Sequence, residues 1–157
     1  MTARTPTAIK LSDILIIEDN EDHLSLTLEA LEDAGLQNPV QSATTLAQAR
    51  VYLRECAAKA QAGADSLPCV ILLDVRLPDG SGMEVLREIK QEPLLRSIPV
   101  VVLTSSDDTP DVQSAYLLGA NSYLVKPIAF EDFHRKVRDA GLYWALLNHW
   151  CQPDSRG

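Results

Sequence analysis

The chain has 157 residues, 46% of them hydrophobic, and a formal net charge of −8 at pH 7. This length suits one domain with its own core, and the acidic balance, without any Lys or Arg run, opposes direct nucleic-acid binding. No apolar run is fit to be a signal sequence or to cross a bilayer. We therefore expect a soluble, cytoplasmic protein that binds neither nucleic acid nor membrane.

Short apolar runs alternate along the chain with amphipathic stretches of helical length, which is typical of consecutive strand-helix units. Five runs are predicted to be strands: Ile14–Glu18, Val40–Ala43, Cys69–Asp74, Pro99–Thr104 and Ser122–Val125. The first and third runs do not alternate with polar residues, so both of their faces should be buried. The pattern predicts an α/β fold with a doubly wound parallel sheet.

A helical period of apolar residues follows each predicted strand. The five stripes are Leu24, Leu28 and Leu31; Leu46, Ala49 and Leu53; Val85, Leu86 and Ile89; Val112, Tyr116 and Leu117; and Phe130, Phe133 and Val137. Gly35 and Gly119 are expected to end the first and fourth helices, and Pro93 to stop the third. The fifth helix is expected to continue toward Trp150.

The domain organisation is expected to be simple. We assign residues 1–11 to a flexible N-terminal tail, 12–150 to one domain with an extended last helix, and 151–157 to a C-terminal tail. Little sequence follows the fifth helix, so we expect no DNA-binding output domain and an action through protein contacts. Trp144, Leu147 and Trp150 could form a homodimer face or a docking surface, or could fold back over the core, and the sequence leaves these uses open.

Polar residues follow several predicted strands at the same edge of the sheet. Glu18 and Asp19 follow the first strand, Asp74 ends the third, Thr104 ends the fourth, and Lys126 follows the fifth. Parallel sheets of this kind place their chemistry beyond the carboxyl ends of the strands. Each residue alone has a structural explanation, such as a helix cap or a turn. Together they supply the parts of a phosphoryl-transfer site.

The acid cluster suits Mg²⁺, which prefers a few hard oxygen ligands and retained water. Asp19 and Asp74 are the expected direct ligands. A carboxylate can attack phosphorus to form an aspartyl phosphate while a metal offsets charge on the transferring oxygens. Asp74 is therefore the predicted nucleophile. His23, in the first turn of the next helix, lies beside the acid cluster, where a role in phosphotransfer or metal binding is an alternative; we interpret it as a surface histidine.

These residues resemble the receiver domain of bacterial response regulators from about Asp13 to Arg138. The motifs, all in the family's order, are Glu18-Asp19, Asp74-x-x-x-Pro78-x-x-x-Gly82, Thr104-Ser105-Ser106 and Tyr123-x-x-Lys126-Pro127. The resemblance implies a flavodoxin-like sheet with strand order 2-1-3-4-5. It also implies that Asp74 accepts phosphate from a sensor histidine kinase.

The resemblance further implies a role for each site residue. Asp19, Asp74 and the backbone carbonyl of Arg76 would hold Mg²⁺, with Glu18 binding through metal-bound water. Thr104 and Lys126 would contact the phosphoryl oxygens. The protein would catalyse only its own phosphorylation and dephosphorylation.

The same resemblance implies a switch and its partners. Thr104 would move toward the phosphoryl group and Tyr123 would rotate into the vacated space. A downstream protein or a phosphotransfer protein would then recognise the changed surface. The segment Ala120-Asn121-Ser122-Tyr123 and the pair Tyr143-Trp144 are similar to small regulators that partner phytochrome-type histidine kinases.

Other α/β proteins are alternatives to this reading. A phosphatase of the haloacid dehalogenase type needs a second Asp two residues after the nucleophile, where this chain has Arg76. A flavin phosphate would be repelled by Glu18, Asp19, Glu21 and Asp22. A receiver-shaped binding module that works without phosphate remains an alternative, and the stimulus and the lifetime of the phosphate stay open.

Overall fold

The computed structural model describes residues 11–105, 109–126 and 130–144. A parallel sheet has the spatial order β2-β1-β3-β6-β7. Its strands are β1 (Ile14–Ile17), β2 (Val40–Ala43), β3 (Val70–Leu73), β6 (Val100–Thr104) and β7 (Ser122–Val125). All five predicted strands are confirmed to within about a residue. The expected order 2-1-3-4-5 is confirmed as well, with β6 and β7 as the fourth and fifth strands of this sheet.

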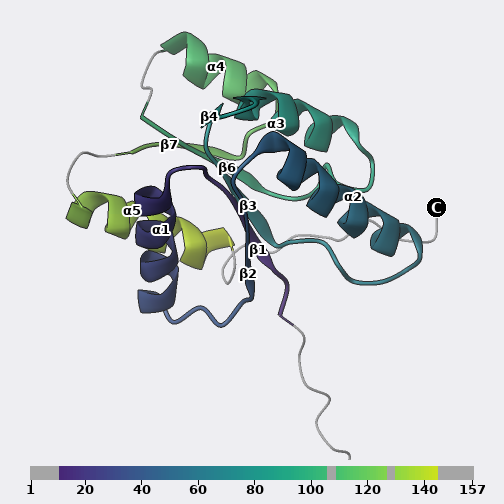
Figure 1. Cartoon of the computed structure of the whole chain (residues 1–157), viewed down its shortest axis with the longest axis horizontal. Helices are drawn as coiled ribbons and strands as arrows, with labels where there is room; N and C mark the ends of the chain where they lie inside the picture. Colours follow the sequence, from purple (N-terminus) through teal and green to yellow (C-terminus); the bar gives the residue numbers. More distant parts are fainter. Residues whose placement is uncertain (1–10, 106–108, 127–129, 145–157) are drawn as a thin grey trace, which may run out of the picture.

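Helices cover both faces of the sheet, as Figure 1 shows. One layer holds α1 (Glu21–Asp33) and α5 (Phe130–Leu142), and the other holds α2 (Leu46–Gln61), α3 (Gly82–Gln91) and α4 (Thr109–Leu117). The sheet therefore separates two hydrophobic cores.

The central strands contribute to both cores because neighbouring side chains point to opposite faces. Ile14 and Ile16 pack on the side of α1 and α5, whereas Leu15 and Ile17 pack on the side of α2 and α3. Every residue of β1, β3 and β6 is buried. The unbroken apolar runs thus have the physical cause that was predicted for them.

The apolar stripe predicted for the first helix is partly wrong. Leu28 is 38% exposed, and the buried residues of α1 are Thr27, Ala30 and Leu31. The Thr27 hydroxyl is satisfied inside the helix, where it donates a hydrogen bond to the His23 carbonyl at 2.8 Å. Small residues let α1 approach the sheet closely, so the packed face turns away from Leu28.

The fourth helix is also rotated relative to its predicted stripe. Tyr116 is 50% exposed and Leu117 is 87% exposed, whereas Ala115 is fully buried against the core. An alanine at this contact permits a close approach of α4 to the sheet. The stripes of α2 and α3 are confirmed, since all of their predicted core residues are buried.

A small hairpin follows β3 and was not predicted. Strands β4 (Arg76–Leu77) and β5 (Gly80–Ser81) pair antiparallel around a two-residue turn. In that turn, the Asp79 carboxylate accepts hydrogen bonds from the backbone N–H groups of Leu46 at 2.8 Å and Ala47 at 3.1 Å. The hairpin is thereby attached to the first turn of α2.

The end of the described chain lies against the core. Trp144 is half-buried and packs with the cluster shared by α1 and α5, and its ring meets Tyr143 edge-on, with centroids 4.9 Å apart. This packing supports the fold-back reading for Trp144. Leu147, Trp150 and most of the two predicted tails lie outside the described residues. Among the described helices, none is both long and apolar enough to span a membrane.

Candidate functional site

The polar residues predicted for one sheet edge do meet there. The chain leaves β1 toward β2 on one side, while β3 lies on the other side, so the strand order reverses between β1 and β3. Glu18 and Asp19 follow β1 at this point and Asp74 follows β3. The Asp74 N–H donates to the Ile17 carbonyl at 2.9 Å, which places the two acidic segments side by side.

Three carboxylates form a compact cluster at this edge. Glu18, Asp19 and Asp74 each offer an oxygen, and these oxygens lie within 4.8 Å of one another. Glu18 is 4% exposed and Asp74 is 9% exposed, whereas Asp19 lies on the open side of the cluster. An all-oxygen donor set that is open to water fits Mg²⁺.

Lys126 balances part of this negative charge. Its Nζ donates to Glu18 Oε2 at 2.6 Å and to Asp74 Oδ2 at 3.1 Å, and it lies 3.0 Å from His23 Nδ1. The Lys126 side chain is only 7% exposed, so little water screens these contacts. The ammonium has three N–H donors, and each of them has an acceptor.

Burial changes the protonation of two groups beside the lysine. It raises the pKa of Glu18 to about 7; Asp74 adds to this effect and Lys126 opposes it. The pKa of His23 is lowered, first by burial and then by the positive charge of Lys126. A neutral imidazole is therefore the favoured form of His23 near neutral pH.

The connection between β3 and α3 requires a glycine. A Cβ atom on residue 82 would collide with the backbone carbonyl oxygen of Asp74. The Gly82 N–H donates to the Val75 carbonyl at 2.7 Å, and the Arg76 N–H donates to Asp74 Oδ1 at 3.3 Å. These contacts explain why the predicted motif places a glycine at this distance from Asp74.

Thr104 and Tyr123 occupy the two strands beyond β3. Thr104 ends β6 and is 1% exposed, and its carbonyl accepts from the Lys126 N–H at 2.7 Å. Tyr123 lies within β7 and is partly buried against the core that packs under α2 and α3. Both residues are thus in the strands where the predicted switch places them.

Sequence reasoning placed His23 beside the acid cluster but preferred to interpret it as a surface histidine, and it gave Asn20 no role in the chemistry of the site. Asn20 caps α1, where its Oδ1 accepts from the His23 N–H at 3.0 Å, and its own N–H donates to Glu18 Oε1 at 3.2 Å. The His23 side chain is 41% exposed, but its Nδ1 faces Lys126. Its position, four residues after Asp19 in the first turn of a helix, was the available signal.

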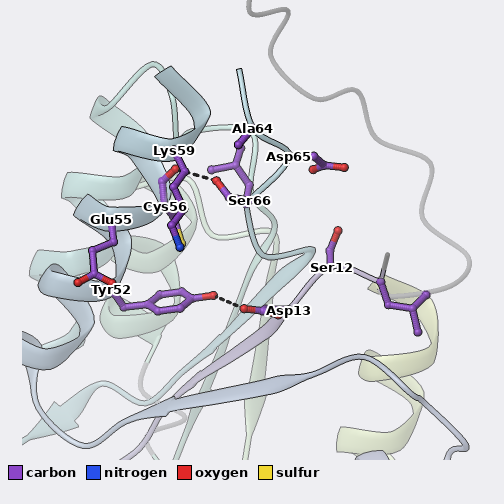
Figure 2. Close-up of a pocket in the computed structure, with 11 residues that line it drawn as sticks. Ser12, Asp13, Tyr52, Glu55, Cys56, Lys59, Ala64, Asp65 and Ser66 are labelled. Atoms are coloured by element: carbon purple, nitrogen blue, oxygen red, sulfur yellow. Dashed lines mark hydrogen bonds between the residues drawn. The ribbon is translucent and has the colours of Figure 1, made fainter. Parts of the chain in front are cut away.

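A cavity of about 310 Å³ lies elsewhere and takes no part in this site (Figure 2). It is lined in part by Asp13, whose carboxylate accepts from the Tyr52 hydroxyl at 2.9 Å, and by Ser66, whose hydroxyl donates to the Cys56 carbonyl at 3.1 Å. Asp13 precedes β1, whereas Glu18 follows it. The cavity therefore lies at the opposite edge of the sheet.

Comparison with known proteins agrees with this geometry. The family described as the response regulator receiver domain matches residues 14–138. The chain belongs to this receiver family. Receiver domains are signalling modules of two-component systems and bind Mg²⁺ at an acidic pocket, and this receiver domain has an acid cluster formed by Glu18, Asp19 and Asp74.

Similar proteins include two curated regulators. The probable methanogenesis regulatory protein FilR2 of Methanothrix harundinacea is 43% identical over 140 residues, which cover 89% of this chain and 88% of that protein. The response regulator Rcp1 of Synechocystis is 34% identical over 131 residues, which cover 83% of this chain and 87% of Rcp1.

Solved structures of phytochrome response regulators have the same fold. The phosphorylated cyanobacterial phytochrome response regulator RcpA superposes with a TM-score of 0.79 at 32% identity, covering 89% of this chain and 98% of RcpA. The Mn²⁺-bound form of Rcp1 has a TM-score of 0.78, also at 32% identity, covering 89% and 99% of the two chains. This receiver domain is therefore homologous to Rcp1 and RcpA, and the predicted similarity to phytochrome regulators is confirmed.

Proposed function

We propose that Asp74 of this receiver domain accepts a phosphoryl group from a sensor histidine kinase and that the phosphorylated domain signals through protein contacts. The observation that carries the proposal is the nearly buried arrangement of Asp74, Lys126 and Glu18 at the switch point of the sheet. Homology to phytochrome response regulators supports a phytochrome-type kinase as the partner, and we place the reaction in the cytoplasm.

A divalent cation belongs to this proposal because the carboxylate cluster has the donor chemistry for it. Glu18, Asp19 and Asp74 would hold Mg²⁺ together with the backbone carbonyl of Arg76. When bound, the cation supplies positive charge that offsets the charge of the transferring phosphoryl oxygens. The similar regulator Rcp1 has been solved in a Mn²⁺-bound form.

The reacting group is the Asp74 carboxylate. One of its oxygens attacks phosphorus, the new O–P bond forms, and the bond between phosphorus and the donor breaks with its electron pair leaving on the donor. The Lys126 ammonium already lies 3.1 Å from Asp74 Oδ2 and would donate to a phosphoryl oxygen. The Thr104 hydroxyl, at the end of the neighbouring strand, would donate to another.

The added charge of about −2 is the signal in this proposal. It would draw Thr104 toward Asp74 and let the Tyr123 ring move inward, which changes the surface formed by α4, β7 and α5. Tyr116 and Leu117 on α4 are large exposed groups where a downstream partner could detect the change. A preference of a few kcal/mol for the active arrangement is enough to shift the population.

Intact-mass measurement with a small phosphodonor tests the proposal. Wild-type protein is incubated with acetyl phosphate, with and without Mg²⁺, beside Asp74→Asn and the control Asp139→Asn, which changes an exposed aspartate of α5. One Mg²⁺-dependent phosphoryl adduct in wild type and control, absent from Asp74→Asn, is the expected result. An adduct that persists in Asp74→Asn, or no adduct in any sample, would overturn the proposal.

A further inference from the structure

The environment of Lys126 contains one acceptor that is not a carboxylate. Besides Glu18 Oε2 at 2.6 Å and Asp74 Oδ2 at 3.1 Å, its Nζ lies 3.0 Å from His23 Nδ1. Because the ammonium can only donate, this contact requires His23 Nδ1 to carry a lone pair and Nε2 to carry the proton. His23 is thus the neutral third partner of the lysine.

His23 differs from Glu18 and Asp74 because it takes no direct part in the proposed reaction. In the proposed function, Asp74 becomes bonded to phosphorus and Glu18 turns toward a cation, so both carboxylates leave their present contacts with Lys126. His23 has neither task. It can therefore keep one N–H of the ammonium fixed while the other two are redirected.

The His23 ring is held where this contact needs it. Its backbone N–H donates to the capping Asn20 side chain at 3.0 Å, which fixes the first turn of α1. Its ring lies beside Phe133 of α5, with centroids 6.2 Å apart and an interplanar angle of 36°, and Phe133 is 4% exposed. The imidazole is therefore supported by two helices.

We propose that His23 is a positioning residue for Lys126: it keeps the ammonium directed at Asp74 during phosphorylation. The inference rests on the proposed function of Asp74 as phosphoacceptor. His23 forms and breaks no covalent bond in it. Without His23, the ammonium would lose the one present contact that persists during the reaction and would be less well directed at the incoming phosphoryl group.

Two substitutions separate the acceptor from the ring. His23→Leu removes the acceptor, whereas His23→Asn can place its amide oxygen near the position of Nδ1. His134→Leu is the matched control, because His134 lies on α5 with its Nε2 2.7 Å from Asp33 Oδ2, at the C-terminal end of α1. Circular dichroism of each variant verifies that it is folded before kinetics are compared.

The measurement is the rate of Asp74 phosphorylation by acetyl phosphate, followed by intact mass over a series of Mg²⁺ concentrations. We expect His23→Leu to lower the rate constant at saturating Mg²⁺ by about tenfold, the size expected for one hydrogen bond to a charged group. The Mg²⁺ concentration at half-maximal rate should not change. His23→Asn should recover most of the rate, and His134→Leu should match wild type.

The inference fails if His23→Leu is phosphorylated as fast as wild type. It also fails if Leu and Asn slow the reaction equally, since the shape of the ring would then matter rather than its acceptor. These results leave the role of Asp74 intact. A wild-type protein that takes up no phosphate would instead reject the proposed function, and the role of His23 with it.

Discussion

Glu18 shows, at the scale of a single residue, that the site opposes the stability of the protein. Its carboxyl group is nearly buried beside Asp74, with Lys126 as an ion-pair partner and the Asn20 N–H as a hydrogen-bond donor. Burying a charged group is unfavourable unless it is well paired, so ionised Glu18 lowers the free energy of unfolding. A nearly buried carboxylate that lowers stability is expected in a binding site, where its charge is needed for the ligand.

The raised pKa of Glu18 predicts how stability depends on pH in metal-free protein. The folded value of about 7 exceeds the ordinary 4.5, so the folded state binds more protons between these values. The contribution of Glu18 to stability is therefore present below pH 4.5 and is lost as pH rises through 7. The loss should reach about 3 kcal/mol at pH 8.

Glu18→Gln should remove this component, because the amide keeps an acceptor for Lys126 but does not ionise. Urea denaturation in EDTA at pH 5 and pH 8 measures it. The fall in the free energy of unfolding between these pH values should be smaller in the variant than in wild type. An identical fall in both proteins would contradict the prediction.

Gly82 is a second residue whose identity is dictated locally. Gly82→Ala places a Cβ against the Asp74 carbonyl, which is backbone and cannot rotate away. We expect a loss of about 2 kcal/mol in the free energy of unfolding, typical of overpacking, and slower phosphorylation because Asp74 itself is displaced. Gly35→Ala is the comparator, since its φ of 77° is unfavourable for alanine but the space around it is open.

Gly35→Ala should lower the free energy of unfolding by only about 1 kcal/mol and leave the phosphorylation rate unchanged. Equal phosphorylation rates in the two glycine variants would show that Asp74 tolerates the added methyl group.

At the scale of elements, the first turn of α2 connects the site to the rest of the fold. The N–H groups of Leu46 and Ala47 donate to Asp79, and the Gln48 N–H donates to the Thr45 hydroxyl at 3.1 Å. The three N–H groups that the helix itself leaves unpaired are thus satisfied. Asp79 lies in the hairpin that contains Arg76, whereas Thr45 directly precedes α2.

This difference predicts that two capping substitutions act differently on metal binding. Asp79→Ala should raise the Mg²⁺ concentration at half-maximal phosphorylation several-fold, because it releases the segment that carries the Arg76 carbonyl. Thr45→Ala should lower the free energy of unfolding by about 1 kcal/mol and leave that Mg²⁺ concentration unchanged. Equal Mg²⁺ dependence in both variants would show that the hairpin is positioned without Asp79.

The fold of the whole molecule brings three carboxylates together, so a cation bound between them should stabilise the folded state. Mg²⁺ is expected to raise Tm because it binds the folded state. The added free energy of unfolding should grow with the logarithm of the Mg²⁺ concentration and reach about 2.7 kcal/mol at 100 times Kd. Differential scanning calorimetry measures this effect, with NaCl at matched ionic strength as the control. Asp19→Asn should weaken it, and an equal rise in NaCl would indicate screening rather than binding.

Two features at this scale stay predictions. A homodimer face on the last helix is one, because Leu147 and Trp150 lie outside the described residues. The role of the Arg76 carbonyl as a metal ligand is the other.

The strands and the edge that holds the chemistry could be predicted because they depend on local patterns. Unbroken apolar runs indicate strands buried on both faces, and parallel strands all end at the same edge, so Asp19, Asp74 and Lys126 had to converge. The rotation of α1 and α4 could not be predicted. Leu28 and Leu117 are apolar at helical spacing, but the fit of Ala30 and Ala115 against the sheet determines which face packs.

The contacts that join distant segments depended on the tertiary structure alone. His23 and Lys126 are separated by 103 positions, and Asp79 and Leu46 by 33, and no local periodicity relates such pairs. The chain order of the motifs indicates which groups reach the site. Which of them share a hydrogen bond is decided by how the helices pack on the sheet, since packing sets distances to within an ångström and residue spacing does not.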